Sequence, residues 1–267
     1  MAGHQGMLGG LDLETSQAVS SESQLEGLMA GKLDMAITAI DNLFTWTEAG
    51  ADVRLIAQVE KTTPLKVYAR GSAGSLAELE GCRFGVDAPL NGFVLAARRV
   101  LRSAGVEVQY VTVGGVRERF DALVAGDVDA TLLGPPFSEL ASAQGMQCLA
   151  NLNCLLLDFP GQGLVVRAGV ADSNELQEYL RALAWGVRSC GWLSSLEGRA
   201  FLSLYGFADE AASAAWDARP DTLEVSSAGL AALTDIRRSL ELLPVDIELA
   251  ELWDPGPLRR ALDSTVP

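Results

Sequence analysis

The chain has 267 residues, of which 49% are hydrophobic and 21% are charged, and it carries a formal net charge of −15. This apolar content is ample for a buried core, and the length suits one large domain or two smaller lobes. The acidic charge argues against a nucleic-acid partner, since no basic groove or Arg-rich helix is present. No apolar stretch approaches the roughly 20 residues that cross a bilayer, so we expect a soluble monomer.

The first part of the chain alternates helix-like and strand-like segments. A run of N-cap residues at 20–23 begins a helix that ends at Gly31. Short apolar runs then predict strands at Met35–Ala39, Val53–Val59 and Leu65–Ala69. Such alternation is typical of an α/β fold.

The same alternation continues through the middle of the chain. Strands are predicted at Cys82–Val86 and Val128–Leu133, and helices at Phe93–Ala104 and Val116–Ala125. From Ser173 onward the pattern becomes mostly helical.

An internal repeat is the most informative feature of the sequence. Residues 25–37 align without gaps on residues 120–132, and both copies predict a helix, an Ala-Gly stop and a buried strand. Each strand is followed by a break, Asp41-Asn42 in one copy and Gly134-Pro135-Pro136 in the other. We interpret the copies as two α/β units in different lobes, with both strands ending at one ligand cleft. Chance similarity between two ordinary helix–strand turns is the alternative.

The cysteines and the histidine give no sign of metal or histidine chemistry. The four cysteines, Cys82, Cys148, Cys154 and Cys190, form no C-x-x-C pair. We expect buried or half-buried free thiols, with a Cys148–Cys154 disulfide as the alternative. The single histidine, His4, is close to the N-terminus, where a catalytic base is hard to hold rigidly. The sequence therefore predicts no metal site, no cofactor and no catalytic residue.

Longer segments resemble a known family. Residues 10–14 and 21–36 are similar to substrate-binding proteins of ABC importers, in the group for nitrate, sulfonates, taurine and thiamine pyrimidine precursors. Residues 85–89, 125–130 and 134–137 support this resemblance. It implies a ligand-capturing protein that works with ABC permease and ATPase subunits.

The resemblance also implies an architecture, a two-lobed α/β fold of the periplasmic-binding-protein type II. Lobe one would comprise residues 1–69 and 167–267, and lobe two residues 70–166. The chain would cross between the lobes at Tyr68-Ala69-Arg70 and at Gly163–Val166.

The start of the chain departs from the family pattern. Relatives place a strand ahead of the segment that residues 2–7 resemble, and residues 1–13 lack the basic and apolar segments of a secretory signal. The resemblance implies a periplasmic or other extracytoplasmic location, whereas a true start at Met1 implies a cytoplasmic one. We expect an unfilled place beside the Met35–Ala39 strand, or another segment that fills it.

Candidate ligand-binding residues in lobe one lie where a helix begins or a strand ends. Ser21 and Ser23 begin a helix, and the free N–H groups there suit an anionic ligand. Plain N-capping is the simpler explanation of both serines. Asp41 and Asn42 follow a strand, where they either hydrogen-bond a ligand or cap the next helix.

Four candidates in lobe two lie at a single junction between a strand and a helix. Asp87, Asn91, Gly92 and Phe93 lie between a strand and a helix, where α/β folds bind ligands. An N-cap role for Asn91 and a core position for Phe93 are the alternatives.

Further candidates in lobe two follow the next two strands. Gly114 allows a close approach of backbone to ligand, or simply a tight turn. Gly134, directly after a strand, is a further ligand-binding candidate, and Pro135, Pro136 and Phe137 are expected to form a rigid apolar wall. Arg117 and Arg119 are expected on a solvated helix face, not as anion clamps.

These residues together predict capture of a small, anionic or heteroaromatic ligand between two lobes, without chemistry. Two alternatives remain open: an enzyme on the same fold, such as a lyase or a pyrimidine-synthase-like protein, and a cytoplasmic ligand sensor.

Overall fold

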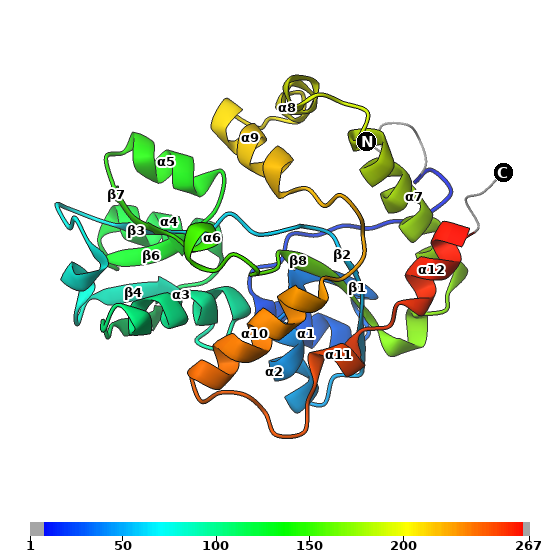
Figure 1. Cartoon of the computed structure of the whole chain (residues 1–267), viewed down its shortest axis with the longest axis horizontal. Coiled ribbons are helices and arrows are strands. Elements are labelled where there is room, and N and C mark those ends of the chain that lie inside the picture. Colours follow the sequence, from blue (N-terminus) through cyan, green and yellow to red (C-terminus); the bar gives the residue numbers. More distant parts are fainter. Residues whose placement is uncertain (1–7, 264–267) are drawn as a thin grey trace.

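The computed structural model describes residues 8–263 and places their strands in two sheets (Figure 1). The smaller sheet has the strand order β1-β8-β2, from Met35–Ala39, Gln162–Arg167 and Val53–Gln58. β8 runs antiparallel to both neighbours. This sheet and the helices that pack on it are called lobe one below.

The larger sheet has the order β5-β4-β6-β3-β7. Its strands are β3 (Lys66–Ala69), β4 (Arg83–Val86), β5 (Gln109–Thr112), β6 (Ala130–Leu133) and β7 (Gln147–Asn151). β4 is parallel to β5 and β6, whereas β3 is antiparallel to β6 and β7. This sheet and its helices are lobe two. The strands of the two repeat copies, β1 and β6, therefore lie in different sheets, as the repeat predicts.

The helices cover both sheets, and most of the C-terminal part is helical, as predicted. Lobe one carries α1 (Ser21–Met29), α2 (Asn42–Glu48), α7 (Asn174–Cys190), α10 (Ser227–Ser239), α11 (Leu249–Leu252), α12 (Gly256–Asp263) and the 3₁₀ turn η2 (Ala168–Val170). Between α7 and α10, α8 (Ser195–Ser203) and α9 (Asp209–Ala218) pack on each other. Lobe two carries α3 (Gly92–Ser103), α4 (Val116–Ala125), α5 (Phe137–Ala143) and the 3₁₀ turn η1 (Leu76–Leu79). None of the described helices is long and apolar enough to span a bilayer.

The small sheet is buried on both faces, which explains its continuous apolar runs. Side chains of a strand alternate between the two faces of a sheet. Leu55 of β2 packs in the same cluster as Phe44 of α2, whereas the next residue, Ile56, packs with α7 and α12. Both β2 side chains are fully buried.

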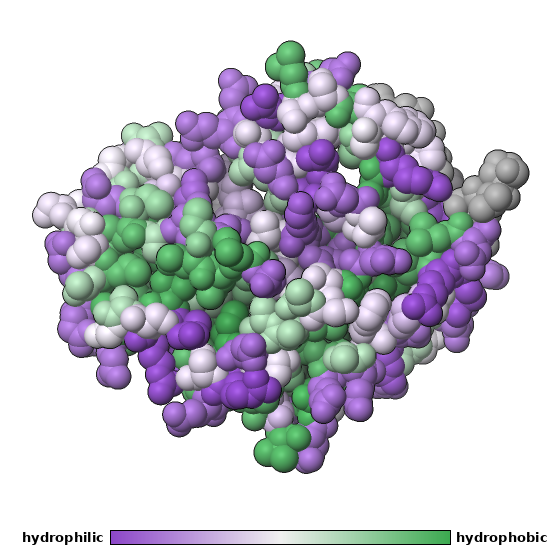
Figure 2. Space-filling model, viewed as in Figure 1, coloured by the Kyte–Doolittle hydropathy of each residue, from purple (hydrophilic) through white to green (hydrophobic). Residues whose placement is uncertain are grey.

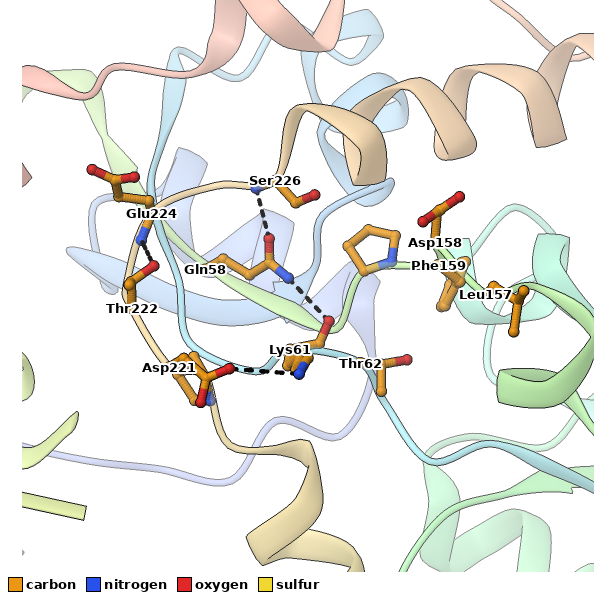
Figure 3. Close-up of a pocket in the computed structure, with 12 residues that line it drawn as sticks. Gln58, Lys61, Thr62, Leu157, Asp158, Phe159, Asp221, Thr222, Glu224 and Ser226 are labelled. Carbon is orange, nitrogen blue, oxygen red and sulfur yellow. Dashed lines mark hydrogen bonds and ion pairs between the residues drawn. The ribbon is translucent and has the colours of Figure 1, made fainter. Parts of the chain in front are cut away.

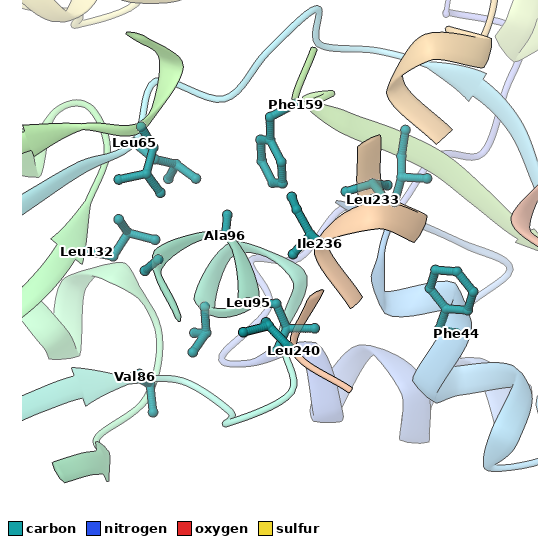
Figure 4. Packing of buried hydrophobic residues seen from close by; sticks show 14 of the residues in the cluster. Phe44, Leu65, Val86, Leu95, Ala96, Leu132, Phe159, Leu233, Ile236 and Leu240 are labelled. Atoms are coloured by element: carbon teal, nitrogen blue, oxygen red, sulfur yellow. The ribbon is translucent and has the colours of Figure 1, made fainter. Parts of the chain in front are cut away.

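The two lobes share one apolar core. Leu95 and Ala96 of α3 in lobe two belong to the same cluster as Leu233 and Ile236 of α10 in lobe one, with Phe159 beside them (Figure 4). Burial of apolar surface therefore stabilises the contact between the lobes directly, in addition to the chain segments that join them.

The chain crosses between the sheets at residues 59–65 and again at residues 152–161, a stretch that includes the short helix α6 (Leu152–Leu155). The crossings expected at Tyr68-Ala69-Arg70 and Gly163–Val166 are wrong by several residues. Tyr68 pairs with Thr131 and Cys148 inside the large sheet, and Leu164 pairs with Ile37 inside the small one. These two segments are apolar because their side chains are buried in the sheets, and not because they cross between the lobes.

Among residues 8–263, β1 has a strand neighbour on one side only, and this neighbour is β8. It pairs with β1 along its whole length, from Met35–Val166 to Ala39–Gln162. On the other side of β1 no strand of residues 8–263 pairs, but the Gln24 side chain donates to the Ile37 carbonyl at 2.9 Å. One backbone acceptor of this edge is thus capped by a side chain of α1.

Gly161 lies where the two crossings run close together. Its N–H donates to the Lys61 carbonyl at 3.3 Å, and an added Cβ would lie 2.4 Å from the Glu60 carbonyl oxygen. We expect Gly161→Ala to lower the free energy of unfolding, measured by chemical denaturation, by about 1–3 kcal/mol because backbone must move. Gly169→Ala, where an added Cβ meets nothing within 4 Å, is the control and should change it by less than about 0.5 kcal/mol. Equal losses in both variants would contradict this packing.

Candidate ligand-binding site

Asn42, at the start of α2, joins the two lobes. Its Nδ2 donates to Thr38 Oγ1 at 2.8 Å, which orients the amide. Its Oδ1 then accepts the N–H of Gly92, at the start of α3, at 3.1 Å. An added Cβ on Gly92 would lie 2.5 Å from Asp41 Cβ, so the lobes meet this closely only because residue 92 is glycine. Asn42 and Gly92, predicted from different lobes, are in direct contact.

Asp41 is bound within lobe one. Its Oδ2 accepts from Arg237 Nε at 2.9 Å and from Nη2 at 2.6 Å, and the guanidinium carbon lies 4.8 Å from the centre of the Phe44 ring. Both charged side chains are almost completely buried. Burial raises the pKa of the Asp41 carboxyl, and the hydrogen bonds from Arg237 oppose this rise. This arrangement anchors α10 of lobe one to α2.

A second contact between the lobes involves charged groups. Ser21 Oγ of α1 donates to Asp87 Oδ2, after β4, at 3.3 Å. Asp87 Oδ1 lies 3.5 Å from Arg119 Nη1 of α4, and all three side chains are buried. Burial lowers the pKa of Arg119, and the charge of Asp87 opposes this effect.

Two atoms of this contact have no hydrogen-bond partner among residues 8–263, namely Asp87 Oδ1 and Arg119 Nε. A buried polar atom without a hydrogen bond costs about 1–3 kcal/mol, so a hydrogen bond to either atom would be favourable. The contact can therefore offer one charged acceptor and one charged donor to a small molecule.

The expectation that Arg119 lies on a solvated helix face is wrong, and the sequence contained a signal against it. Arg119 precedes the buried Leu123 by four residues, a spacing that puts both on one face of α4. Arg117 is exposed, as expected, with its guanidinium 5.1 Å from the centre of the Phe137 ring.

Two candidates are helix caps, the alternative considered for both. The N–H of Ser23 donates to Ser20 Oγ and the N–H of Ser20 donates to Ser23 Oγ, each at 3.1 Å, which forms a capping box. Asn91 Oδ1 accepts the N–H of Phe93 at 2.9 Å and caps α3. The Phe93 ring lies 6.2 Å from that of Phe159, in contact with the core. These residues shape the helix starts on which Ser21 and Gly92 lie.

The Gly114-Gly115 turn approaches the chain's own N-terminal segment. Gly114 has φ +112°, in the region that favours glycine, and its N–H donates to the Val86 carbonyl at 3.3 Å. An added Cβ on Gly115 would lie 3.0 Å from the Val19 carbonyl oxygen. The close approach expected here is thus made by backbone of residue 19, two residues before Ser21.

The expected apolar wall packs on lobe two and on the first crossing. An added Cβ on Gly134 would lie 3.0 Å from the Pro64 carbonyl oxygen, and the Pro135–Pro136 peptide is cis. The Phe137 ring is buried 5.6 Å from the Phe120 ring, in the core cluster beneath α4. Phe120 directly follows Arg119 in α4, so the Phe137 ring packs against the residue next to the charged contact.

A cavity of about 330 Å³ lies beside the crossings, away from these contacts (Figure 3). Gln58 donates to the Lys61 carbonyl at 3.1 Å and accepts the Ser226 N–H at 3.0 Å. None of the expected site residues, all of which the structure describes, lines this cavity. Leu157 lines it and is 83% exposed, and Figure 2 shows hydrophobic residues gathered on the same face around α6.

The cysteines form no disulfide within residues 8–263. Cys148 and Cys154 are exposed, so the expected burial is wrong for these two; Cys148 lies on the edge strand β7 and Cys154 on the short helix α6. His4 lies outside the described residues. In the described part of the chain no group of three or more His, Cys, Asp or Glu side chains could hold a metal ion.

Solved structures share this fold at low sequence identity. The ligand-binding component of an ABC-type import system from Staphylococcus aureus, with zinc bound, has a TM-score of 0.79 at 12% identity, covering 97% of this chain and 93% of that one. The alkanesulfonate-binding protein SsuA from Xanthomonas axonopodis pv. citri, bound to MOPS, gives 0.75 at 19%, covering 94% and 92%. The desulfurization enzyme DSZB gives 0.68 at 15%, covering 99% and 95%. The expected two-lobed fold of periplasmic binding proteins is confirmed.

No match was found among curated protein sequences. The family model described as NMT1/THI5 like matches residues 9–190, which is more than half of the chain and includes the segments on which the resemblance rests. The chain therefore belongs to the NMT1/THI5-like family.

Proposed function

We propose that the chain captures a small molecule between its two lobes and delivers it, chemically unchanged, to an ABC importer. The observation that carries this proposal is a pair of buried atoms without a hydrogen bond, Asp87 Oδ1 and Arg119 Nε, at the contact between the lobes. A ligand that binds both would form hydrogen bonds to charged groups, worth about 1.5–3 kcal/mol each. The similar binding proteins of ABC import systems support the same role.

Hydrogen bonds between the lobes would stabilise a closed arrangement of the two lobes. The hydrogen bonds from Gly92 to Asn42 and from Ser21 to Asp87 form only when the lobes are together. A ligand that binds this arrangement more tightly than an open one shifts the population toward closure. Its affinity would thus come from the ligand contacts and from these bonds combined.

The ligand class that fits best is a small anion or an anionic heteroaromatic molecule. Ser21 and Gly92 each begin a helix, α1 and α3, and helix N-termini favour negative charge. Arg119 adds a buried positive charge, and Asp87 would accept from a donor group of the ligand. The partners implied are a permease and an ATPase, with the protein monomeric and extracytoplasmic.

Thermal melting against a panel of taurine, MOPS, nitrate, an aminopyrimidine and benzoate tests this function. A bound compound at about 100 times its Kd should add roughly 2.7 kcal/mol to the free energy of unfolding. We expect at least one compound to raise the melting temperature and to be recovered unchanged by mass spectrometry. If every compound leaves the melting temperature unchanged, this ligand class is wrong.

An enzyme on the same fold is the second candidate, favoured by the likeness to the desulfurization enzyme DSZB. Chemistry would have to rest on a carboxylate, and Asp87 is the buried one with an unpartnered oxygen. A product that wild type forms from a panel compound, and that Asp87→Asn no longer forms, would decide for the enzyme.

A further inference from the structure

A second cavity, of about 440 Å³, opens between α3, β5 and the C-terminal end of α10. Its lining includes Arg98 and Arg102 of α3, Tyr110 of β5, and Leu240, which ends α10. α3 and β5 belong to lobe two and α10 to lobe one, so the cavity has walls from both lobes. None of the residues at the Ser21–Asp87 and Asn42–Gly92 contacts, which the structure describes in full, lines it.

The lining of the cavity holds more arginine than acidic side chains, although the protein as a whole is acidic. Its lining contains two arginines and one acidic residue, Glu107, whereas the whole chain has 35 acidic and 20 basic residues. Arg98 and Arg102 are four residues apart on α3, so both guanidinium groups extend from one face of the helix. At short range each guanidinium group can attract an anion, and Glu241 beside Arg102 offsets part of this charge.

Arg102 contacts lobe one through its two terminal nitrogen atoms, Nη1 and Nη2. Its Nη1 donates to the Ser239 carbonyl, in the last turn of α10, at 2.9 Å. Its Nη2 lies 3.5 Å from Glu241 Oε1, with the two side chains 55% and 84% exposed. Ion pairs this exposed contribute little, so an anion in the cavity can replace Glu241 as the partner of Nη2.

The rest of the lining is aromatic and apolar. The Arg98 guanidinium lies 5.4 Å from the centre of the Tyr110 ring, and that ring meets the Phe84 ring edge-on at 6.0 Å. Val106 and Leu240 are buried side chains of the lining. Such a surface binds the apolar body of a ligand, while the arginines bind its charged group.

We propose that this cavity is a second binding site, for a small organic anion with an aromatic body such as an aromatic carboxylate. Its volume is within the range of small-molecule pockets. The carboxylate would accept from Arg98 and Arg102, and the ring would lie against Tyr110 and Leu240. Because the ligand touches both lobes, its binding would favour the arrangement in which they are together.

Isothermal titration calorimetry of the full chain with 2-naphthoate tests the site. We expect saturable binding that the double variant Arg98→Gln/Arg102→Gln weakens at least about tenfold, because two charged hydrogen bonds are lost. 2-Naphthylmethanol, which has the same rings without the charge, should bind more weakly than 2-naphthoate. Arg99→Gln is the control, to be compared with each single variant, Arg98→Gln and Arg102→Gln: it also removes one positive charge from α3, but Arg99 does not line the cavity and donates to Ser103 instead. Its effect should stay within about twofold.

Amide chemical shifts then locate the probe. We expect 2-naphthoate to shift the amides of Val106, Val108 and Leu240. Shifts confined to Ser21, Asn42 and Gly92 would place the probe between the lobes and overturn the proposal. Absence of saturable binding, or an equal loss in Arg99→Gln, would overturn it as well.

Discussion

Arg237→Met should lower the free energy of unfolding by about 3–5 kcal/mol, because removing one partner of a buried ion pair leaves the other charge uncompensated. Arg237 is the partner of Asp41, and its Nη2 also donates to Thr45 Oγ1 at 3.1 Å. Both charged side chains lie beside the contact between the lobes and are almost fully buried. Chemical denaturation measures the loss.

The neighbouring arginine supplies the control for this variant. Arg238 pairs with Asp235, and both side chains are largely exposed, so Arg238→Met should cost less than about 1 kcal/mol. The double variant Asp41→Asn/Arg237→Met removes both charges and should recover part of the loss. Equal losses for Arg237→Met and Arg238→Met would contradict the buried pair.

The loss should also depend on pH. Burial raises the pKa of the Asp41 carboxyl, and without Arg237 nothing opposes this rise. A carboxyl with a raised pKa in the folded state stabilises the fold while it is protonated and loses that contribution as the pH rises. The deficit of Arg237→Met should therefore shrink as the pH is lowered.

Arg119→Met should weaken the binding of any compound that raises the melting temperature by about 10- to 150-fold, which corresponds to one hydrogen bond to a charged group. Methionine keeps the apolar stem of the side chain buried but removes the unpartnered Nε. Calorimetric titration of the compound into wild type and variant gives the ratio of the dissociation constants.

Arg188→Met is the control for this loss. It removes the same charge from the exposed side of α7, far along the chain from the contact between the lobes, and should leave binding unchanged. Asp87→Asn should weaken compounds that carry a donor group, such as taurine, more than nitrate, which has none. If Arg119→Met binds as tightly as wild type, the site does not lie at this contact.

The division into two sheets could be predicted because the information is local. Each repeat copy contains a complete helix–stop–strand pattern, and β1 and β6 lie where the repeat places them. The crossings could not be placed as well. Tyr68 and Leu164 are apolar whether a segment crosses between lobes or pairs in a sheet, and only long-range pairing decides between the two.

The contacts between the lobes were predictable only in part. Ser21, Asn42, Asp87 and Gly92 are candidates because each lies at a strand end or a helix start. Which of them meet depends on contacts across 50 and 66 residues of sequence, which no local pattern contains.

The burial of Arg119 and Arg237 is not predicted by residue type, because arginine is mostly an exposed residue. Their helical spacing was the available signal. Arg119 precedes the buried Leu123 by four residues, and Arg237 follows the buried Leu233 by four, so each occupies a position on the buried face of its helix.

Amide hydrogen exchange at two adjacent residues tests the central claim most directly. The N–H of Gly92 donates to Asn42 in the other lobe, whereas the N–H of Phe93 donates to Asn91 in the same lobe. With a panel compound that raises the melting temperature, exchange should slow more at Gly92 than at Phe93, because ligand capture holds the lobes together. Equal slowing at both amides, or none at Gly92, would contradict capture between the lobes.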